Sequence, residues 1–263
     1  NLLNVKVILG SATPSVEPFY NVKIGKYGLV KLLKRYGGVE MPEIRCIDLK
    51  EAYRKKNMNG FFSNELINEI NKSLSNNKQV ILFQNRRGYA PIIECVDCGH
   101  IPQCPNCDVA LTFHQFNNQM KCHYCGYNIS KLDKCLNCGG LDINHKGIGT
   151  QKIEEQINSL FPGVNVARMD WDSTRGKKSF DKIIDSFTEG KVKILIGTQM
   201  ITKGLDFKNV SLVGVLNADS LMNFPDFRSH ERSFQMISQV AGRAGRSKDR
   251  GEVIIQTFSP DHD

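Results

Sequence analysis

Eight of the nine cysteines in this chain form four Cys-x-x-Cys pairs, which are Cys95/Cys98, Cys104/Cys107, Cys122/Cys125 and Cys135/Cys138. A Cys-x-x-Cys turn places two thiolates on one side of a tight loop, so two such turns supply the four ligands of a tetrahedral zinc site. Zinc is redox-inert and suits sulfur ligands. The pattern therefore predicts two structural zinc ions, each with four cysteine ligands and no open position for catalysis.

Other uses of these thiols fit the sequence less well. A disulfide framework requires an oxidising compartment, and we find no secretory signal in the chain. A redox Cys-x-x-Cys needs one pair, not four. Spacing alone leaves open whether outer pairs and inner pairs share ions or whether neighbouring pairs do. Eight thiolates already fill two sites, so we expect the neighbouring histidines to be surface residues: His100, His114 and His123.

The cysteine-rich stretch has the features of a zinc ribbon. Between the inner pairs, apolar residues alternate with polar ones around Asn117–Asn118, which predicts a β-hairpin. Three glycines follow the second cysteine of a pair and suit a left-handed backbone: Gly99, Gly126 and Gly139. Three aromatic residues could stack on bases or fill the small core of the ribbon, and we favour the core: Phe113, Phe116 and Tyr124.

The composition is that of a basic globular protein. The formal net charge of +8 favours a polyanionic partner such as DNA, but two four-thiolate zinc sites would lower it to +4. The charge therefore supports nucleic-acid binding without establishing it. The sequence contains no run of about 18 apolar residues, so we expect no membrane span.

A second group of chemically suited residues lies near the end of the chain, in Gln239-Val240-Ala241-Gly242-Arg243-Ala244-Gly245-Arg246. Phosphoryl transfer develops negative charge that guanidinium groups neutralise. On a helix, the spacing of Gln239, Arg243 and Arg246 would place all three on one face. We therefore expect both arginines on the surface at the carboxyl edge of a sheet, without strong internal salt bridges. The two glycines favour close approach to another surface.

Strands that alternate with helices must position these groups. Apolar runs predict strands at 5–9, 44–49, 80–83, 164–169, 192–196, 210–216 and 253–256. Helical spacing predicts helices from an N-cap at Ser63 and over 150–160, 180–187 and 229–244. Such alternation is typical of an α/β domain with a parallel sheet and helices on both faces. The cysteine-rich stretch interrupts it as an insertion, and Cys46 is expected to be a buried thiol in a strand.

Three segments resemble motifs of superfamily 2 helicases, in the order that those helicases have. Ser11-Ala12-Thr13 resembles motif III, the segment from Gly197 to Phe207 resembles motif V, and the segment from Gln239 to Arg246 resembles motif VI. More specific matches are similar to the PriA family of bacterial replication-restart helicases. They comprise the four cysteine pairs, Phe83 to Pro91, Gly149 to Gln151, Arg168 to Asp170, and Asn223 to Arg228 followed by Glu231 and Arg232.

The resemblance implies a RecA-like second motor lobe of a 3′-to-5′ DNA helicase in the bacterial cytoplasm. The full-length enzyme would use ATP and Mg²⁺, recognise stalled replication forks and drive primosome assembly. Its partners would be forked DNA, primosome proteins, single-stranded DNA-binding protein and the loader of the replicative helicase. The resemblance also implies nested zinc sites, with Cys95, Cys98, Cys135 and Cys138 in one and Cys104, Cys107, Cys122 and Cys125 in the other.

Roles at the motor site follow from the same resemblance. Gln239, Arg243 and Arg246 would be catalytic, with Arg246 as the arginine finger. DNA contact and coupling would fall to Ser11, Thr13, Thr198, Gln199, Lys203, Gly204 and Asp206. We expect 1–20 to end the first lobe, 21–93 and 142–263 to form the second, and 94–141 to be the two-zinc insertion.

The chain departs from the family pattern in one respect. No G-x-x-x-x-G-K-[ST] loop and no D-E-x-H box occurs in the sequence, so we expect the chain to lack ATPase activity by itself. The alternative function is a zinc-ribbon scaffold without a motor, which binds DNA or primosome proteins. Motifs III, V and VI argue against it.

Overall fold

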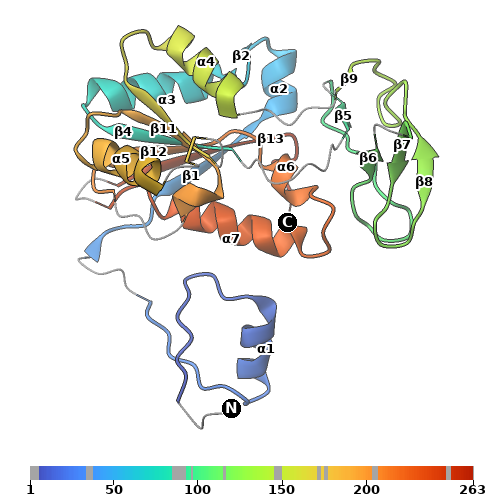
Figure 1. The fold of residues 1–263 in the computed structure, drawn as a ribbon, viewed down its shortest axis with the longest axis horizontal. Coiled ribbons are helices and arrows are strands. Elements are labelled where there is room, and N and C mark those ends of the chain that lie inside the picture. The colour runs from blue at the N-terminus through green and yellow to red at the C-terminus, as the bar shows by residue number, and fades with distance from the viewer. Residues whose placement is uncertain are drawn as a thin grey trace.

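A six-stranded parallel sheet forms the centre of the fold in a computed structural model of the chain (Figure 1). The structure describes residues 6–33, 38–84, 93–95, 97–114, 117–144, 150–170, 173–174, 177–202, 207–246 and 250–262. The strand order is β1-β13-β12-β4-β11-β10. The strands are β1 Glu43–Asp48, β13 Glu252–Thr257, β12 Val210–Val215, β4 Gln79–Phe83, β11 Ile194–Gly197 and β10 Val166–Met169.

The central strands form where the sequence is continuously apolar. All residues of β4 are buried, and so are those of β11. Such runs are typical of parallel strands that are covered on both faces. The predicted parallel α/β sheet is thereby confirmed.

Helices cover both faces of the sheet. One face packs against α3 (Asn64–Ser75) and α4 (Thr150–Leu160), which bury Leu66, Ile70, Ile153 and Ile157 completely. The other face packs against α5 (Lys177–Thr188) and α7 (Ser229–Ala241). The remaining short elements of this domain are α2 Leu49–Arg54, β2 Met58–Asn59, β3 Phe62–Ser63, the 3₁₀ helix η2 Gln199–Thr202 and α6 Asp219–Met222.

Side-chain caps fix where two of the helices begin. The Ser63 hydroxyl accepts a hydrogen bond from the Leu66 amide at 3.2 Å, as the predicted N-cap requires. The Asp48 carboxylate caps α2 in the same way, through the Lys50 amide at 2.8 Å. Helix α4 has the predicted bounds, whereas α7 ends at Ala241, three residues before the expected end.

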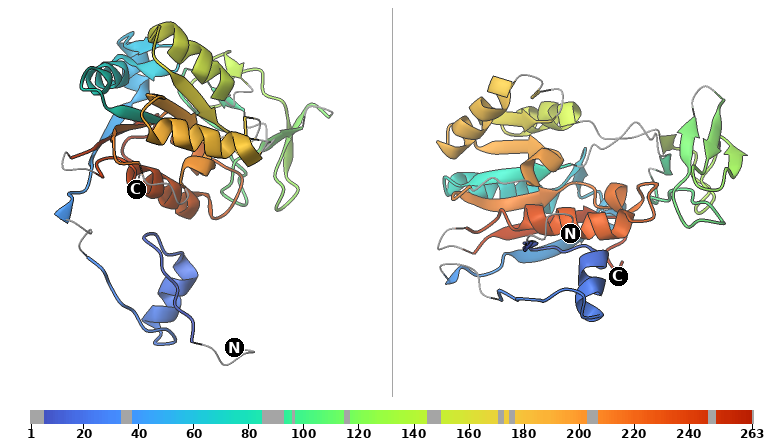
Figure 2. Two further views of the ribbon diagram at one scale, coloured as in Figure 1. Left: turned by 60° about the vertical axis from the view of Figure 1, so that its left-hand side comes forward. Right: turned by 60° about the horizontal axis from the view of Figure 1, so that its bottom comes forward.

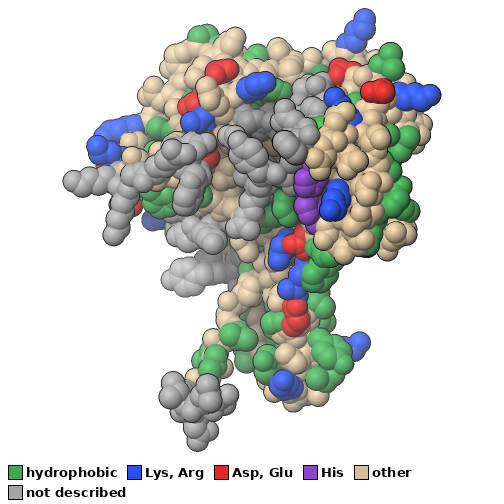
Figure 3. Space-filling view, turned by 45° about the vertical axis from the view of Figure 1, so that its right-hand side comes forward, with side chains coloured by type: hydrophobic (Ala, Val, Ile, Leu, Met, Phe, Trp, Pro, Cys, Tyr) green, Lys and Arg blue, Asp and Glu red, His purple; other side chains and the backbone are tan. Residues whose placement is uncertain are grey.

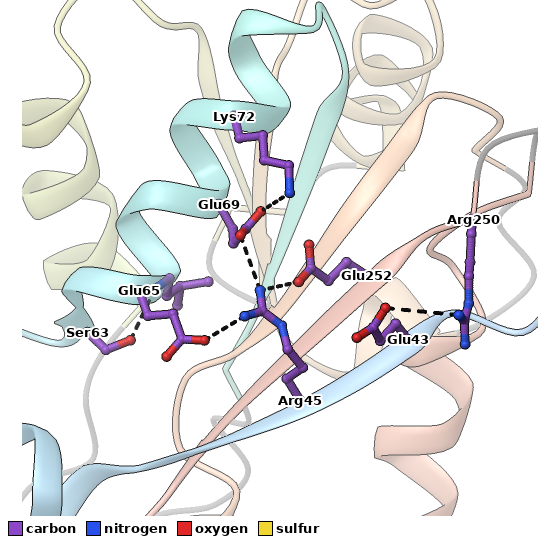
Figure 4. Close-up of polar contacts among 9 residues, drawn as sticks. Glu43, Arg45, Ser63, Glu65, Glu69, Lys72, Arg250 and Glu252 are labelled. Atoms are coloured by element: carbon purple, nitrogen blue, oxygen red, sulfur yellow. Dashed lines mark hydrogen bonds and ion pairs between the residues drawn. The ribbon is translucent and has the colours of Figure 1, made fainter.

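A charged cluster links the amino end of the edge strand β1 to α3 and to the neighbouring strand β13 (Figure 4). The Arg45 guanidinium pairs with Glu65 at 2.7 Å and Glu69 at 3.2 Å on α3, and also with Glu252 on β13. Arg45, Glu69 and Glu252 line an open hollow of about 360 Å³, together with Glu43, Lys72, Arg250 and Gly251. Because the hollow lies where the strands begin, and its opposite charges are paired, we interpret it as a clamp on the edge strand.

Two sequence expectations about burial are wrong. Cys46 is exposed, because β1 is an edge strand and Cys46 faces away from Ile47, which packs into the core. The described part of 5–9 is no strand, and Val7, Ile8 and Leu9 are 73%, 95% and 67% exposed. A strand requires a neighbouring strand to satisfy its backbone groups, and the described structure places none beside these residues.

Residues 6–33 project from the sheet domain and contact it through α7. The segment contains α1 (Val16–Lys23), which buries none of its residues. Glu231 on α7 accepts a hydrogen bond from the Val16 amide at 2.8 Å, and Arg228 pairs with Glu17. Figure 3 shows hydrophobic side chains on the part that projects below the main body. Among the described residues, no helix is both long enough and apolar enough to cross a membrane.

The cysteine-rich insertion lies beside one edge of the sheet domain (Figure 2). Its base is an antiparallel pair, β5 (Glu94–Cys95) with β9 (Ile143–Asn144). Its body is a three-stranded antiparallel sheet of β6 (Thr112–His114), β7 (Gln119–Lys121) and β8 (Asn128–Ser130). The predicted hairpin joins β6 to β7, and Asn118 adopts a left-handed backbone with φ 49°. The third strand, β8, was not predicted.

Candidate functional site

The eight paired cysteines gather into two clusters. One contains Cys95, Cys98, Cys135 and Cys138, and the other contains Cys104, Cys107, Cys122 and Cys125. Within each cluster the sulfur atoms all lie within 4.8 Å of one another. The outer pairs of the sequence therefore meet each other, and so do the inner pairs, which is the nested arrangement.

The sulfur spacing suits a tetrahedral metal ion. The Cys95 and Cys138 sulfurs are 3.6 Å apart, and the Cys104 and Cys125 sulfurs are 3.5 Å apart. Four sulfurs around zinc, each at about 2.3 Å, would be about 3.8 Å apart. A disulfide would bring two sulfurs to about 2.05 Å. All nine cysteines are free of disulfides, so the donor set fits zinc.

All four Cys-x-x-Cys turns share one backbone geometry. In each turn the amide of the residue after the second cysteine donates to the carbonyl of the first, at 2.9 to 3.2 Å. That residue has a positive φ in every turn, 71° at Gly99, 78° at Gly126, 73° at Gly139 and 48° at Asp108. The glycine prediction is confirmed, and Asp108 takes the glycine position in the second turn because aspartate tolerates this conformation.

Backbone amides also point at the sulfur atoms. The Tyr124, Asn137 and Gly140 amides each donate to a cysteine sulfur at 3.4 Å. These bonds favour the thiolate form, which is the form that binds metal.

The thiols of the two clusters differ widely in acidity. The Tyr127 amide above all lowers the pKa of Cys125 to about 6. Although burial opposes it, the Cys138 and Asn137 amides lower the pKa of Cys135 to about 7. Burial raises the pKa of Cys95 to about 12. Each cluster thus has one thiol that ionises readily and can begin metal binding.

Histidines stay outside both four-sulfur clusters in the described part of the chain. The Nε2 atoms of His114 and His123 lie 3.2 Å apart, and both side chains are at the ribbon surface. Of the three aromatic residues, Phe113 is 5% exposed and packs in the ribbon core, whereas Tyr124 is 52% exposed. Phe116 lies outside the described residues.

Two contacts dock the insertion onto the sheet domain. The Cα of Gly99 lies so close to Phe258 that a Cβ there would be 2.5 Å from the ring. The Phe258 ring in turn stacks on Tyr53, with centroids 6.0 Å apart. At the second contact the Phe227 amide donates to the Tyr124 hydroxyl at 3.4 Å. Nothing in the sequence around Gly99 indicates a partner at Phe258, so this docking could not be predicted from the sequence.

The motif V segment begins where β11 ends. Thr198 is 8% exposed, and its amide donates to the Met169 carbonyl of β10 at 3.3 Å. The Gln199 side chain contacts the Met236 sulfur on α7 at 2.7 Å. Motif V is therefore packed between β10 and α7. Lys203, Gly204 and Asp206 lie outside the described residues.

The motif VI arginines differ from the expected arrangement. Gly242 is the C-cap of α7, so Arg243 and Arg246 lie beyond the helix and do not share a helical face with Gln239. Arg243 is buried, at 8% exposed, and Arg246 is partly buried, with its Nε donating to the Gly242 carbonyl at 3.0 Å. The helix ends early because the next turn buries Ala244 in the core, which draws Arg243 inward.

Motif VI also lies at a different edge of the sheet from the carboxyl edge that was predicted. The Gly245 amide donates to the carbonyl of Val210, the first residue of β12, at 3.0 Å. Gly245 has φ 65°, and a Cβ there would be 2.2 Å from the Gly251 amide nitrogen, just before β13. The motif VI turn therefore lies at the amino edge of the sheet. The expected close approach of a glycine to another surface is confirmed at Gly245.

Motif III meets motif VI in this structure. The Gln239 side chain donates to the Thr13 hydroxyl at 3.2 Å. Ser11 is exposed, and its hydroxyl accepts from the Thr13 amide at 3.1 Å. Two of the residues selected from the sequence, far apart in the chain, are thus in contact.

Comparisons with known proteins give matches for both the cysteine-rich insertion and the sheet domain. Residues 104–129 match the PriA DNA helicase Cys-rich region domain, and residues 143–248 match the helicase conserved C-terminal domain. The Replication restart protein PriA of Bacillus subtilis is 45% identical over 256 residues, which are 97% of this chain and 32% of that protein. The PriA of Haemophilus influenzae is 44% identical, over 99% of this chain and 35% of that protein.

Among solved structures, S. cerevisiae Dbp5 L327V bound to RNA and ADP BeF3 aligns with a TM-score of 0.45 and 17% identity. The alignment covers 96% of this chain and 44% of that chain. The fold assignment does not depend on this alignment, because the strand order and helix layers define the fold directly.

The fold and the matched regions define a class, a helicase C-terminal domain with a cysteine-rich zinc-ribbon insertion. Within that class, identity of 40 to 45% over nearly the whole chain is shared with replication restart proteins of several bacteria. The chain belongs to the PriA family. It spans about a third of the length of the curated relatives it matches.

Proposed function

We propose that this chain supplies the second motor lobe of an ATP-dependent DNA helicase that restarts replication at stalled forks, with 3′-to-5′ polarity. The observation that carries the proposal is the placement of two helicase motifs on one parallel sheet. Motif V begins at the carboxyl end of β11, and the motif VI turn packs at the amino end of β12. One lobe could thereby contact DNA at one edge of its sheet and nucleotide phosphates at the other.

Each motif has a separate task in this proposal. Thr198 and Gln199 contact the DNA backbone, and Lys203, Gly204 and Asp206 share in DNA contact and in its coupling to ATP hydrolysis. Arg246 serves as the arginine finger, with Arg243 and Gln239 beside it. The bond between Gln239 and Thr13 supports a coupling role for motif III, in which Ser11 also takes part.

We propose that each four-cysteine cluster holds one structural Zn²⁺. Four sulfur ligands leave no open position on the ion, so its contribution is to fold the insertion. The docking contacts at Gly99 and Tyr124 then hold the folded insertion beside the carboxyl edge of the sheet, where β13 ends. This position supports a role for the insertion in contact with DNA or partner proteins.

The full-length protein would supply what this chain lacks. A first lobe would bring the phosphate-binding loop, ATP and Mg²⁺, with residues 1–20 ending that lobe, and the chain alone would be inactive. The second lobe would comprise 21–93 and 142–263, with 94–141 as the insertion. In the bacterial cytoplasm, its partners would be primosome proteins, single-stranded DNA-binding protein and the loader of the replicative helicase.

The proposal is tested by changing Arg246 in the full-length protein. Arg246→Ala should lower kcat of DNA-stimulated ATP hydrolysis by up to about 10³-fold, because a finger neutralises charge that develops on the phosphate. Arg246→Lys should not restore the rate, since an ammonium lacks the planar fork of a guanidinium. DNA binding in the absence of nucleotide should stay unchanged and serves as the control. A wild-type rate in Arg246→Ala would contradict the assignment.

A further inference from the structure

The carboxylate of Asp170 is a buried charged group that the proposed roles leave unused. Asp170 directly follows β10 at the carboxyl edge of the sheet and is 3% exposed. Burying a carboxylate is costly unless hydrogen bonds or an opposite charge compensate for the lost hydration. Its surroundings must therefore supply that compensation.

Three groups from different segments meet this carboxylate. The Thr150 hydroxyl donates to Oδ2 at 2.5 Å, and the Ser173 amide donates to Oδ1 at 2.8 Å. The Arg168 Nε lies 3.0 Å from Oδ2, as a charge contact without a well-directed hydrogen bond. Although burial opposes ionisation, the Thr150 hydroxyl and the Ser173 amide lower the pKa of Asp170. The group is thus held as a carboxylate that accepts bonds.

These contacts join the start of α4 to the end of β10. Thr150 is the first residue of α4 and is completely buried. Ser173 and Thr174 form a turn that folds back on β10, where the Thr174 hydroxyl donates to the Asp170 carbonyl at 2.5 Å. A single carboxylate therefore fixes a helix start and a turn at one corner of the sheet.

The same corner contacts motif V at two points. The Thr174 hydroxyl lies 3.4 Å from the Met200 sulfur in η2. The Thr198 amide donates to the carbonyl of Met169, the residue before Asp170. Motif V therefore begins against a surface whose shape depends on the Asp170 contacts.

Stability alone does not account for a charge at this place. Helix α4 is already anchored by Ile153 and Ile157, which are both fully buried in the core. Apolar groups of similar volume would hold such a corner as well or better than buried polar groups. Hydrogen bonds also fix the relative position of the segments they join, since they have preferred lengths and angles that apolar packing lacks.

We propose that Asp170 is a positioning residue for the DNA contact at Thr198 and Gln199, which it secures by locking the start of α4 and the Ser173–Thr174 turn against motif V. The proposal rests on the proposed helicase function and adds residues that the motif comparison leaves without a role. Asp170 itself touches neither DNA nor nucleotide. Loss of its contacts should therefore weaken the affinity for DNA and leave the rate of ATP hydrolysis at saturating DNA unchanged.

The test changes Thr150 in the full-length protein and follows ATP hydrolysis as a function of single-stranded DNA concentration. Thr150→Val keeps the shape of the side chain but removes the hydroxyl that bonds to Asp170. The DNA concentration for half-maximal stimulation should rise about tenfold, the order expected for a lost bond to a charged group. The kcat at saturating DNA and the KM for ATP should stay within about twofold of wild type. Thr150→Ser restores the hydroxyl and should restore the DNA dependence.

A matched control is Thr188→Val, the same change at an exposed position at the end of α5, which should leave the DNA dependence unchanged. If Thr150→Val shows wild-type DNA dependence, or if Thr150→Ser fails to restore it, the positioning role is overturned. If wild-type protein shows no DNA-stimulated ATP hydrolysis, the proposed helicase function itself fails. The two failures are therefore distinguishable.

Discussion

Single side chains set the chemistry of the cysteine clusters. Within the inner cluster, the pKa of Cys125 is lowered to about 6, whereas a bond with Cys125 raises the pKa of Cys107 to about 12. The difference arises because the first thiolate to form accepts bonds from the remaining thiols, which then hold their protons. Zinc replaces those protons, so metal binding releases them and strengthens as the pH rises.

The zinc content is the first consequence that can be measured. Cys125→Ser should lower the zinc content from two ions per chain to one, because the inner cluster then has only three thiolates and lacks its most acidic one. Cys46→Ser is the matched control and should retain two ions, since Cys46 belongs to neither cluster. Metal analysis of the purified folded protein checks both. Two tightly bound ions in Cys125→Ser would contradict the assignment of the inner site.

At the level of secondary-structure elements, the end of α7 decides where the motif VI arginines lie. Gly242 ends the helix, and Gly245 then turns the chain against Gly251, which lies just before β13. A regular helix through Arg246 would have carried both arginines along one exposed stripe. The turn instead buries most of Arg243 and brings Arg246 back over Gly242.

Replacing Gly245 should therefore destabilise the domain beyond the usual effect of a left-handed residue. Gly245→Ala should cost about 1–2 kcal/mol for the left-handed backbone and more for the clash of its Cβ with Gly251. The comparison is Gly190→Ala, where φ is 75° but no atom lies within 4 Å of the new Cβ. Urea unfolding should show the larger loss for Gly245→Ala. Equal losses in the two variants would refute the close approach to Gly251.

On the scale of the whole molecule, the chain has two kinds of core. The sheet domain buries two apolar clusters, one on each face of its sheet. The insertion has a small core of its own around Leu111, Phe113 and Met120, which includes the ligand cysteines Cys104 and Cys122. A core of that size depends on metal for its stability.

Removing zinc should consequently unfold the insertion and leave the sheet domain folded. Chelation should abolish hydrogen-exchange protection in β6, β7 and β8, while β4, β11, β12 and β13 keep theirs. The physical reason is that structural zinc contributes on the order of 10 kcal/mol to the folding of a small domain, whereas the sheet has its own buried core. Exchange measured with and without chelator checks this. Loss of protection throughout the chain would show that the two cores fold as one unit.

The sequence by itself determined the local structure and the family. Helix α4 and the Ser63 cap appear where apolar spacing and a capping hydroxyl predict them, because both depend on residues three or four positions apart. The central strands β4, β11 and β12 follow runs of apolar residues, although the apolar run at Val7–Leu9 forms no strand, and the glycines after the cysteines give the turns their geometry. The PriA resemblance also rests on local motifs, so it needed no knowledge of contacts.

Only the tertiary structure decided how distant segments meet. Spacing left the cysteine pairing open, and the fold brings Cys95 to Cys138 and Cys104 to Cys125. The exposure of Cys46 follows from the place of β1 at the sheet edge, and the burial of Arg243 follows from the turn after α7, which buries Ala244 in the core. The physical reason is common to all of these: burial and ligand geometry depend on neighbours that are remote along the chain, whereas periodicity and caps depend on adjacent turns.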